Sequence, residues 1–408
     1  MTKFFKKIKL ILVGSLFIGP FLSVSCFSEK EENQWDTDIK FYVPQPNKGY
    51  TEEMKTQFEK TLTKYFNEIK NQNSSLKNNP DVSIKLEYAQ SSGDLYQKFL
   101  ANNVDNDFAI MSYSDISKKN NDELLPSVAQ TQTLKFLWTP EVTAKFQDKK
   151  EQDPLYLMAQ QANKLQLEDS RFGSYPLDWI GKETQMMWDG SKYGVFYKND
   201  QYTENFYGSI LISGTSQERE QIKKSWLEKD WDTFKSFGIL FNKKTSLSKF
   251  IVPVSIIAKN FGKTYNEIFE YLSNDNSFVS AGKDPAVNLG IKTSSGKTYK
   301  IAFDYDGVFN WTPPTWNPDS AEKTYNFKPT NYPQEQIRYL TMVGPLFYDA
   351  VLARKRMPEA QKEIFAQALA KLQNSENTYG TFSGFNKFIP LNDQKLKDNI
   401  KTLKNIYE

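Results

Sequence analysis

A short polar segment, Thr245-Ser246-Leu247-Ser248-Lys249, combines hydroxyl groups with a lysine just before a predicted helix that has Pro253 in its first turn. Hydroxyls and free backbone N–H groups at a helix start bind anions, and the ammonium group of Lys249 adds positive charge. The same residues also suit an ordinary helix cap beside a solvated lysine, because serine and threonine are common caps. The segment therefore predicts either an anion site or a plain N-cap, and both interpretations stay open at this point.

Two other segments have some features of ligand-binding loops. Gly290 and Gly296, followed by Lys297 and Thr298, nearly match a phosphate-binding loop, but the glycines are one residue too far apart and a predicted strand follows. Asp304-Tyr305-Asp306-Gly307 is similar to the start of a calcium loop, but the later ligands of an EF-hand are missing. We interpret the first segment as a turn, and we expect neither a resident metal nor a cofactor in this protein.

The composition excludes several kinds of catalytic site. The chain has no histidine, which rules out Ser-His-Asp and Cys-His catalysis and every zinc site that uses histidine. Cys26 is the single cysteine, so no disulfide or cysteine-rich metal site can form within the chain. No carboxylate stands out as a general acid paired with a base, so we expect no enzyme. The 52 Lys and Arg residues nearly balance 49 Asp and Glu residues, which argues against a nucleic-acid partner.

The first 26 residues have the pattern of a secretion signal. Four lysines precede an apolar run of thirteen residues, Leu10–Leu22, which is shorter than the ~20 residues of a spanning helix. The run exits through Leu22-Ser23-Val24-Ser25-Cys26, which resembles a bacterial lipoprotein box. We therefore predict a signal peptide at 1–25, a lipidated Cys26 that begins a flexible tether at 26–34, and a protein anchored on the extracytoplasmic face of the membrane. The alternative is an uncleaved anchor with an incidental cysteine.

The rest of the chain predicts an α/β fold. Apolar alternation indicates strands at 39–43, 82–88 and 107–111, and helical spacing indicates helices at 51–70 and 91–101 between them. This β-α-β-α-β order predicts a largely parallel sheet. Residues 120–205 are harder to interpret, apart from helical pieces near 153–166. Further strands are expected at 207–213, 298–303 and 345–352, and further helices at 216–227, from Trp231, after Lys249 and from Pro358.

The ends of the predicted strands are the expected places for a ligand. In open α/β sheets, ligands bind beyond the carboxyl ends of the strands. These ends are the segments 44–49, 91–94, 112–115 and 304–307, which contain the candidate residues Gln45, Ser112 and Tyr113. Ordinary turns and helix caps have the same composition, so each of these segments alone is weak evidence.

Longer segments carry a resemblance to a known family. They are QWDTDIKF at 34–41, WDGSKYGVFY at 188–197, NFYGSILI at 205–212, KKSWLEKDWDTFKSFGIL at 223–240, SLSKF at 246–250, FNWT at 309–312, YDAVLARK at 348–355 and NTYGTFSGFNKF at 377–388. With the lipoprotein box, they resemble the extracytoplasmic thiamine-binding lipoproteins of mycoplasmas (CypI type, the high-affinity transport system lipoproteins). The match is weakest over 50–180. The family's usual Arg-Gly after Phe-Tyr is replaced by Gly208-Ser209 here, so the ligand specificity would differ if that arginine touches the ligand.

The resemblance implies a lipid-anchored, monomeric solute-binding protein that delivers its ligand to the permease of an ABC importer. The implied fold is a two-domain periplasmic-binding-protein-like (type II) α/β fold with a hinge and an interdomain cleft. Domain I would comprise 35–207 and 348–408, and domain II would comprise 208–347. The chain is also distantly similar to phosphonate-type solute-binding proteins, in which a serine-rich helix start holds the phosphoryl group. The implied ligand is thiamine diphosphate or a related thiamine compound.

The same resemblance assigns the candidate ligand residues. Ser246, Ser248 and Lys249 would hold the diphosphate. Aromatic rings suit the flat pyrimidine and the cationic thiazolium. The candidates for this end are Tyr207, Trp188, Tyr193, Trp311, Tyr348 and Asp349. The alternatives are a phosphonate- or organophosphate-binding protein, a surface adhesin with a vestigial cleft, or a surface hydrolase with facing carboxylates.

Overall fold

The computed structural model describes residues 35–89, 92–174, 176–274, 279–281, 285–311 and 329–407. The chain forms two units, residues 1–34 and 35–408, and all described residues belong to the second. The predicted signal peptide and Cys26 lie outside the described residues. Within the described residues, no helix is long and apolar enough to cross a membrane.

The first sheet has seven strands in the order β12-β4-β11-β3-β1-β2, with β5 paired to β4. The strands are β1 (Asp38–Val43), β2 (Ser83–Tyr88), β3 (Phe108–Met111), β4 (Ser127–Phe136), β5 (Tyr197–Thr203), β11 (Ala350–Ala353) and β12 (Lys387–Pro390). The pairs β1–β2 and β1–β3 are parallel, as the sequence predicts, and the other pairs are antiparallel. The expectation of a largely parallel sheet therefore holds only for the first three strands, because later parts of the chain complete the sheet.

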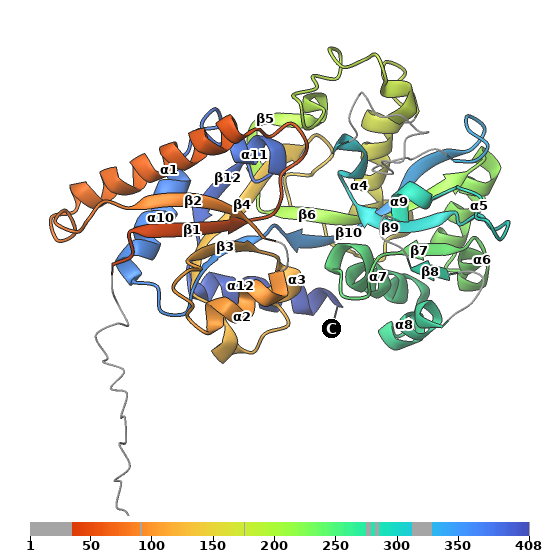
Figure 1. The fold of residues 1–408 in the computed structure, drawn as a ribbon. Coiled ribbons are helices and arrows are strands. Elements are labelled where there is room, and N and C mark those ends of the chain that lie inside the picture. Colours follow the sequence, from red (N-terminus) through yellow and green to blue (C-terminus); the bar gives the residue numbers. More distant parts are fainter. Residues whose placement is uncertain are drawn as a thin grey trace, which may run out of the picture. The chain divides into compact units, whose positions relative to one another are not determined.

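Helices cover both faces of this sheet (Figure 1). On one side lie α1 (Glu52–Gln72), α10 (Glu359–Lys371) and α11 (Thr378–Ser383), and on the other lie α2 (Ser92–Leu100), α3 (Tyr113–Ile116) and α12 (Asp393–Tyr407). The predicted helix 51–70 corresponds to α1, which begins where the Thr51 side chain accepts a hydrogen bond from the Met54 N–H. Its apolar face buries Phe58, Leu62 and Phe66 against the sheet.

The second sheet has five strands in the order β10-β6-β9-β7-β8. They are β6 (Asn205–Gly214), β7 (Ile239–Phe241), β8 (Val279–Ala281), β9 (Ile301–Tyr305) and β10 (Gln336–Phe347). The associated helices are α4 (Pro154–Ala162), α5 (Ser216–Leu227), α6 (Trp231–Ser236), α7 (Val252–Phe261), α8 (Tyr265–Ser273) and α9 (Pro285–Asn288). The predicted helix 216–227 is confirmed as α5, which a capping box between Thr215 and Glu218 begins.

Short helical turns lie in the loops and at helix ends. They are η2 (Asn121–Glu123), η3 (Lys150–Gln152), η4 (Asn163–Leu167), η5 (Pro176–Trp179), η6 (Gly194–Phe196), η7 (Leu247–Ile251) and η8 (Val308–Trp311). The turn η4 extends α4, so the predicted helical pieces near 153–166 are confirmed.

The chain passes between the two sheets at two adjacent places. Glu204 links β5 to β6, and Tyr348-Asp349 links β10 to β11. The backbone N–H of Tyr348 donates to the carbonyl oxygen of Glu204 at 2.9 Å, so the two links lie side by side. The C-terminal helix α12 also reaches the second sheet's helices, because the Ser255 hydroxyl of α7 donates to the carbonyl oxygen of Ile406 at 2.9 Å.

Candidate functional site

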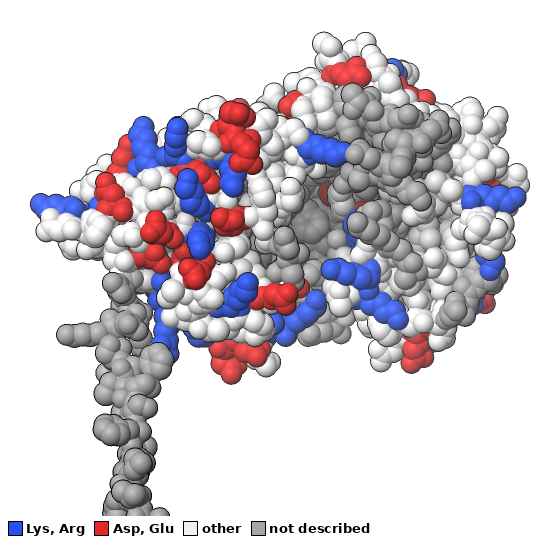
Figure 2. All heavy atoms as spheres, in the orientation of Figure 1, with Lys and Arg blue, Asp and Glu red and all other residues white. Residues whose placement is uncertain are grey.

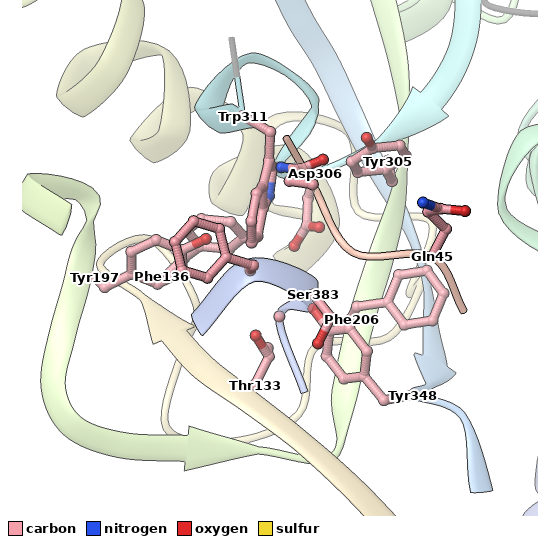
Figure 3. A pocket seen from close by; sticks show the side chains of 14 residues that line it. Gln45, Thr133, Phe136, Tyr197, Phe206, Tyr305, Asp306, Trp311, Tyr348 and Ser383 are labelled. Atoms are coloured by element: carbon pink, nitrogen blue, oxygen red, sulfur yellow. The ribbon is translucent and has the colours of Figure 1, made fainter. Parts of the chain in front are cut away.

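A cavity of about 280 Å³ lies where elements of the two sheets meet beside the Tyr348-Asp349 link (Figure 3). The first sheet and its connections supply residues from the β1–α1 loop, β4, β5, the end of α11 and the α11–β12 loop. The second sheet supplies residues from β6, from the end of β9 and from η8. The lining residues are Gln45, Asn47, Thr133, Phe136, Tyr197, Phe206, Tyr305, Asp306, Gly307, Trp311, Tyr348, Phe382, Ser383 and Gly384.

Aromatic rings form most of the walls. Phe136 stacks on Tyr197 with ring centroids 4.6 Å apart and an angle of 18° between the planes. Phe206 contacts Tyr348 at 4.9 Å between centroids. Trp311 and Tyr305 project from the second sheet's side of the cavity (Figure 3). Such walls suit a flat ligand, and their π faces attract a cation.

Asp306 places a carboxyl group in this aromatic cavity. Asp306 is 3% exposed, and burial raises the pKa of its carboxyl to about 8. Hydrogen bonds from backbone N–H groups, including those of Tyr207 and Gly307, partly offset this rise. Among the described residues, no lysine or arginine forms an ion pair with it. The main chain is fixed, because the Asp306 N–H donates to Tyr207 and the Asp306 carbonyl accepts from the Tyr339 hydroxyl at 3.0 Å. A buried carboxyl without a protein cation favours a cationic ligand.

Two glycines let the walls from the two sheets approach each other. A Cβ atom on Gly307 would lie 2.6 Å from Cζ of Phe136, so a larger residue would force the ring away. A Cβ on Gly384 would lie 3.5 Å from Cζ2 of Trp311, and its φ of +85° also favours glycine. The cavity is therefore closed by direct contact between β4 and the β9 end, and between the α11–β12 loop and η8.

The remaining lining is polar and uncharged. Thr133 donates to the Asn386 side chain at 3.2 Å, and the Ser383 hydroxyl donates to the carbonyl oxygen of Tyr379 at 2.8 Å. Gln45 and Asn47 come from the loop after β1. Among the described residues, no lysine or arginine lines the cavity.

Three of the twelve candidate ligand residues line this cavity: Gln45, Trp311 and Tyr348. Tyr207 lies in the core, where its hydroxyl accepts a hydrogen bond from the Ala144 N–H at 3.0 Å. Trp188 and Tyr193 pair with each other at 4.8 Å between ring centroids. The Tyr193 N–H donates to the carbonyl oxygen of Asn310, the residue before Trp311, so this pair supports the cavity wall without lining it.

The segment 245–249 lies behind the Tyr305 wall. The Ser246 side chain accepts from the Lys249 N–H at 3.3 Å, which is an N-cap interaction at η7. The Lys249 ammonium lies 2.8 Å from the Asp304 carboxylate and 4.8 Å from the centroid of the Tyr305 ring. Ser248 packs its carbonyl oxygen 2.7 Å from where a Cβ on Gly208 would be. That close approach requires glycine at position 208.

The last three candidates surround the link between the sheets. The Ser112 hydroxyl donates to the Asp115 carboxylate at 3.0 Å. The Tyr113 hydroxyl donates to Gln130 at 2.9 Å in the interior. Burial, followed by the nearby Asp115 carboxylate, raises the pKa of Asp349 to about 7. None of these three residues lines the cavity.

The sequence analysis did not single out several of the residues that line the cavity. Phe136 and Thr133 belong to β4, a strand that was not predicted. Tyr197 and Phe206 were quoted only within longer segments, as were Phe382, Ser383 and Gly384. Five of the segments that carry the family resemblance meet at this cavity, and that convergence was the available signal. Asp306 was noted as part of an incomplete calcium loop and of the strand end 304–307, but it was not named as a candidate ligand residue. No group of three metal-ligating side chains occurs within the described residues.

Comparisons with known proteins show the family of the chain. A family model, CypI, described as extracytoplasmic thiamine-binding lipoprotein, matches residues 56–407. The high affinity transport system protein p37 of Mesomycoplasma hyorhinis is 28% identical over 99% of this chain and 98% of its own length. A solved structure of Mh-p37 from Mycoplasma hyorhinis, described as a candidate thiamine pyrophosphate transporter, has a TM-score of 0.78 and 27% identity over 92% of this chain and all of that one. The binding protein of an ABC phosphonate transporter from Pseudomonas aeruginosa aligns over 90% of this chain and 86% of its own, with a TM-score of 0.43 and 10% identity.

Proposed function

The chain belongs to the CypI family of extracytoplasmic thiamine-binding lipoproteins, and we propose that the cavity around Asp306 holds the rings of a thiamine compound. It is a binding protein of a high-affinity transport system and not an enzyme. The ligand that we propose is thiamine diphosphate, or a related thiamine compound, bound where the two sheets meet.

The unpaired carboxyl of Asp306 among aromatic rings is the observation that carries this proposal. The thiazolium ring of thiamine has a positive charge that no change of pH removes. Burying that charge is costly unless π faces or a carboxylate compensate, and this cavity offers both. The flat pyrimidine can stack on the remaining rings, such as Trp311 or Tyr348.

For a phosphorylated ligand, we propose that the segment from Ser246 to Lys249 holds the diphosphate. The Lys249 ammonium contacts the Tyr305 ring, which itself lines the cavity, so the two proposed subsites share one wall. Backbone N–H groups at the start of η7 and α7 add to the attraction for an anion.

In transport, we propose that residues 35–207 with 348–408 form one domain and 208–347 the other, except that α4 and the start of β6 belong with the second sheet. The two links at Glu204 and Tyr348-Asp349 would then act as the hinge. The protein would be a monomer, attached to the membrane by lipidated Cys26, that hands its ligand to an ABC permease. A Cys26→Ser variant should lose fatty-acid labelling, and unchanged labelling would contradict the anchor.

The direct test is to identify the ligand that the protein retains. Mass spectrometry of protein purified under native conditions should detect thiamine or one of its phosphates. Calorimetric titration should then show binding of thiamine compounds and much weaker binding of deazathiamine, in which a neutral thiophene replaces the thiazolium. Equal affinity for deazathiamine would contradict the role of Asp306, and binding of methylphosphonate alone would favour an organophosphate carrier.

A further inference from the structure

A diphosphate needs positive charge, and the cavity walls supply none. Lys192 and Lys249 contact lining rings from behind the aromatic walls, and they pair with aspartates at 2.6 and 2.8 Å. The carboxyl of Asp306, which is largely protonated at neutral pH in the ligand-free protein, adds no positive charge either. The cavity therefore suits the cationic rings, and the approach of a phosphorylated ligand depends on positive charge elsewhere on the protein.

Two segments on opposite sides of the cavity meet beside it. The backbone N–H of Leu247, from the second sheet's side, donates to the hydroxyl of Ser114, from the first sheet's side, at 3.4 Å. Each segment also adjoins the cavity wall. Lys249, two residues after Leu247, contacts the lining ring of Tyr305, as described above. The Tyr113 ring lies 5.5 Å from that of Phe347, the residue before the lining Tyr348.

Each of these segments carries two lysines without an acidic partner. None of Lys118, Lys119, Lys243 and Lys244 forms an ion pair with a carboxylate in the part of the chain that the structure describes. Lys118 and Lys243 are exposed. Lys119 and Lys244 rest over aromatic rings, with the ammonium groups 4.6 and 5.4 Å from the ring centroids. Figure 2 shows basic side chains beside the hollow of this face, over α3 and the start of α7.

We propose that these four residues, the lysine rim, attract the phosphate groups of a phosphorylated ligand and speed its entry to the cavity. The proposal rests on the proposed function, because it assumes that the cavity takes a thiamine compound. Unpaired charges beside a binding cleft raise the association rate of an oppositely charged ligand, and salt screens this attraction beyond a Debye length of about 10 Å at 0.1 M. The lysine rim therefore favours thiamine diphosphate over thiamine kinetically.

The test measures association rates by stopped-flow tryptophan fluorescence. In 20 mM salt, Lys118→Gln/Lys243→Gln should slow association of thiamine diphosphate about three- to tenfold, and 500 mM salt should abolish the difference. Association of thiamine, a cation, should be unchanged or slightly faster. The matched control is Lys60→Gln/Lys77→Gln, which removes the same charge from two exposed lysines of the α1 region.

The outcomes separate this proposal from the proposed function. If wild-type protein binds no thiamine compound, the proposed function fails. If it binds both compounds but the Lys118/Lys243 variant associates with the diphosphate as fast as wild type, the lysine rim proposal is wrong. The last measurement compares the binding of wild type and of the Lys118/Lys243 variant to vesicles containing phosphatidylglycerol. If the variant loses vesicle binding while its diphosphate association rate stays the same, the lysines serve lipid headgroups and the proposal is overturned.

Discussion

Asp304 and Asp306 are both buried at the end of β9, yet they have opposite electrostatic surroundings. Asp304 pairs with Lys249 at 2.8 Å and accepts hydrogen bonds from the backbone N–H groups of Tyr305 and Ala286. Asp306 faces the cavity without a lysine or arginine partner among the described residues. Burial raises the pKa of both, but only for Asp304 does a neighbouring ammonium oppose the shift. The paired aspartate stabilises the fold, and we propose that the unpaired one faces the ligand.

The largest expected effect comes from breaking the pair. Lys249→Met leaves the Asp304 carboxylate buried with no counter-ion, since the Asp304 side chain is 1% exposed. We expect the free energy of unfolding, measured by urea denaturation, to fall by about 3–5 kcal/mol. Lys229→Met is the matched control, because its 2.8 Å pair with Asp148 has side chains 39% and 44% exposed. That change should cost less than about 1 kcal/mol, and equal losses in both variants would refute the distinction.

The next effect is on binding. Asp306→Asn keeps the shape of the side chain but removes the charge that would face the thiazolium. We expect affinity for thiamine to fall about thirtyfold, or ~2 kcal/mol, while the ligand-free protein is as stable as wild type or more so. Calorimetric titration and urea denaturation measure the two quantities. If the affinity matches that of a control such as Asp105→Asn, Asp306 does not contact the cation.

The contrast between these two aspartates was outside the reach of sequence analysis. Residues two apart on a strand share a face, so the spacing places 304 and 306 together. β9 ends at Tyr305, however, and the turn that follows directs Asp306 into the cavity. The sequence does identify the β9 end as a place for a ligand, but it does not show which carboxylate lacks a partner.

Strand β4 was missed for a physical reason. Its residues Gln130, Thr131 and Thr133 are buried but polar, so the strand lacks an apolar alternation. These polar side chains hydrogen-bond to the link between the sheets. Gln130 donates to the Tyr348 carbonyl at 2.7 Å, and Thr131 donates to the Asp349 carbonyl at 2.6 Å. The prediction of one strand at 345–352 is also wrong. This apolar run is divided between β10 and β11, which belong to different sheets. The α/β order and most helices were predictable because their periodicity is local.

A smaller effect should appear with pH. Asp306 has a pKa of about 8, so its carboxyl is largely protonated at neutral pH in the ligand-free protein. The cation favours the carboxylate, so affinity for thiamine should rise about tenfold from pH 7 to a plateau above pH 8. The raised pKa has the opposite effect on folding, because the native state binds more protons than the unfolded state between about pH 4 and 8. The stability that protonated Asp306 contributes is therefore fully present below about pH 4 and is lost as pH rises through 8.

Asp306→Asn should flatten both pH dependences. Titrations from pH 6 to 9, with urea denaturation at each pH, measure the two slopes. A wild-type affinity that is independent of pH, or that falls as pH rises, would show that Asp306 does not supply the charge.

The smallest expected effect concerns a wall of the cavity. The Lys192 ammonium lies 5.6 Å from the centroid of the Trp311 ring, so the ring already makes a cation–π contact within the protein. That cation weakens the attraction of the ring for a second positive charge, and stacking on the pyrimidine is the larger contribution. Trp311→Leu should therefore cost only about 0.5–1.5 kcal/mol of affinity and remove part of the ligand-induced quench of tryptophan fluorescence. Trp231→Phe, which changes a partly buried ring in α6, should leave the quench intact. If Trp311→Leu retains the full quench and affinity, the ring does not stack on the ligand, and the charge of Asp306 acts without it.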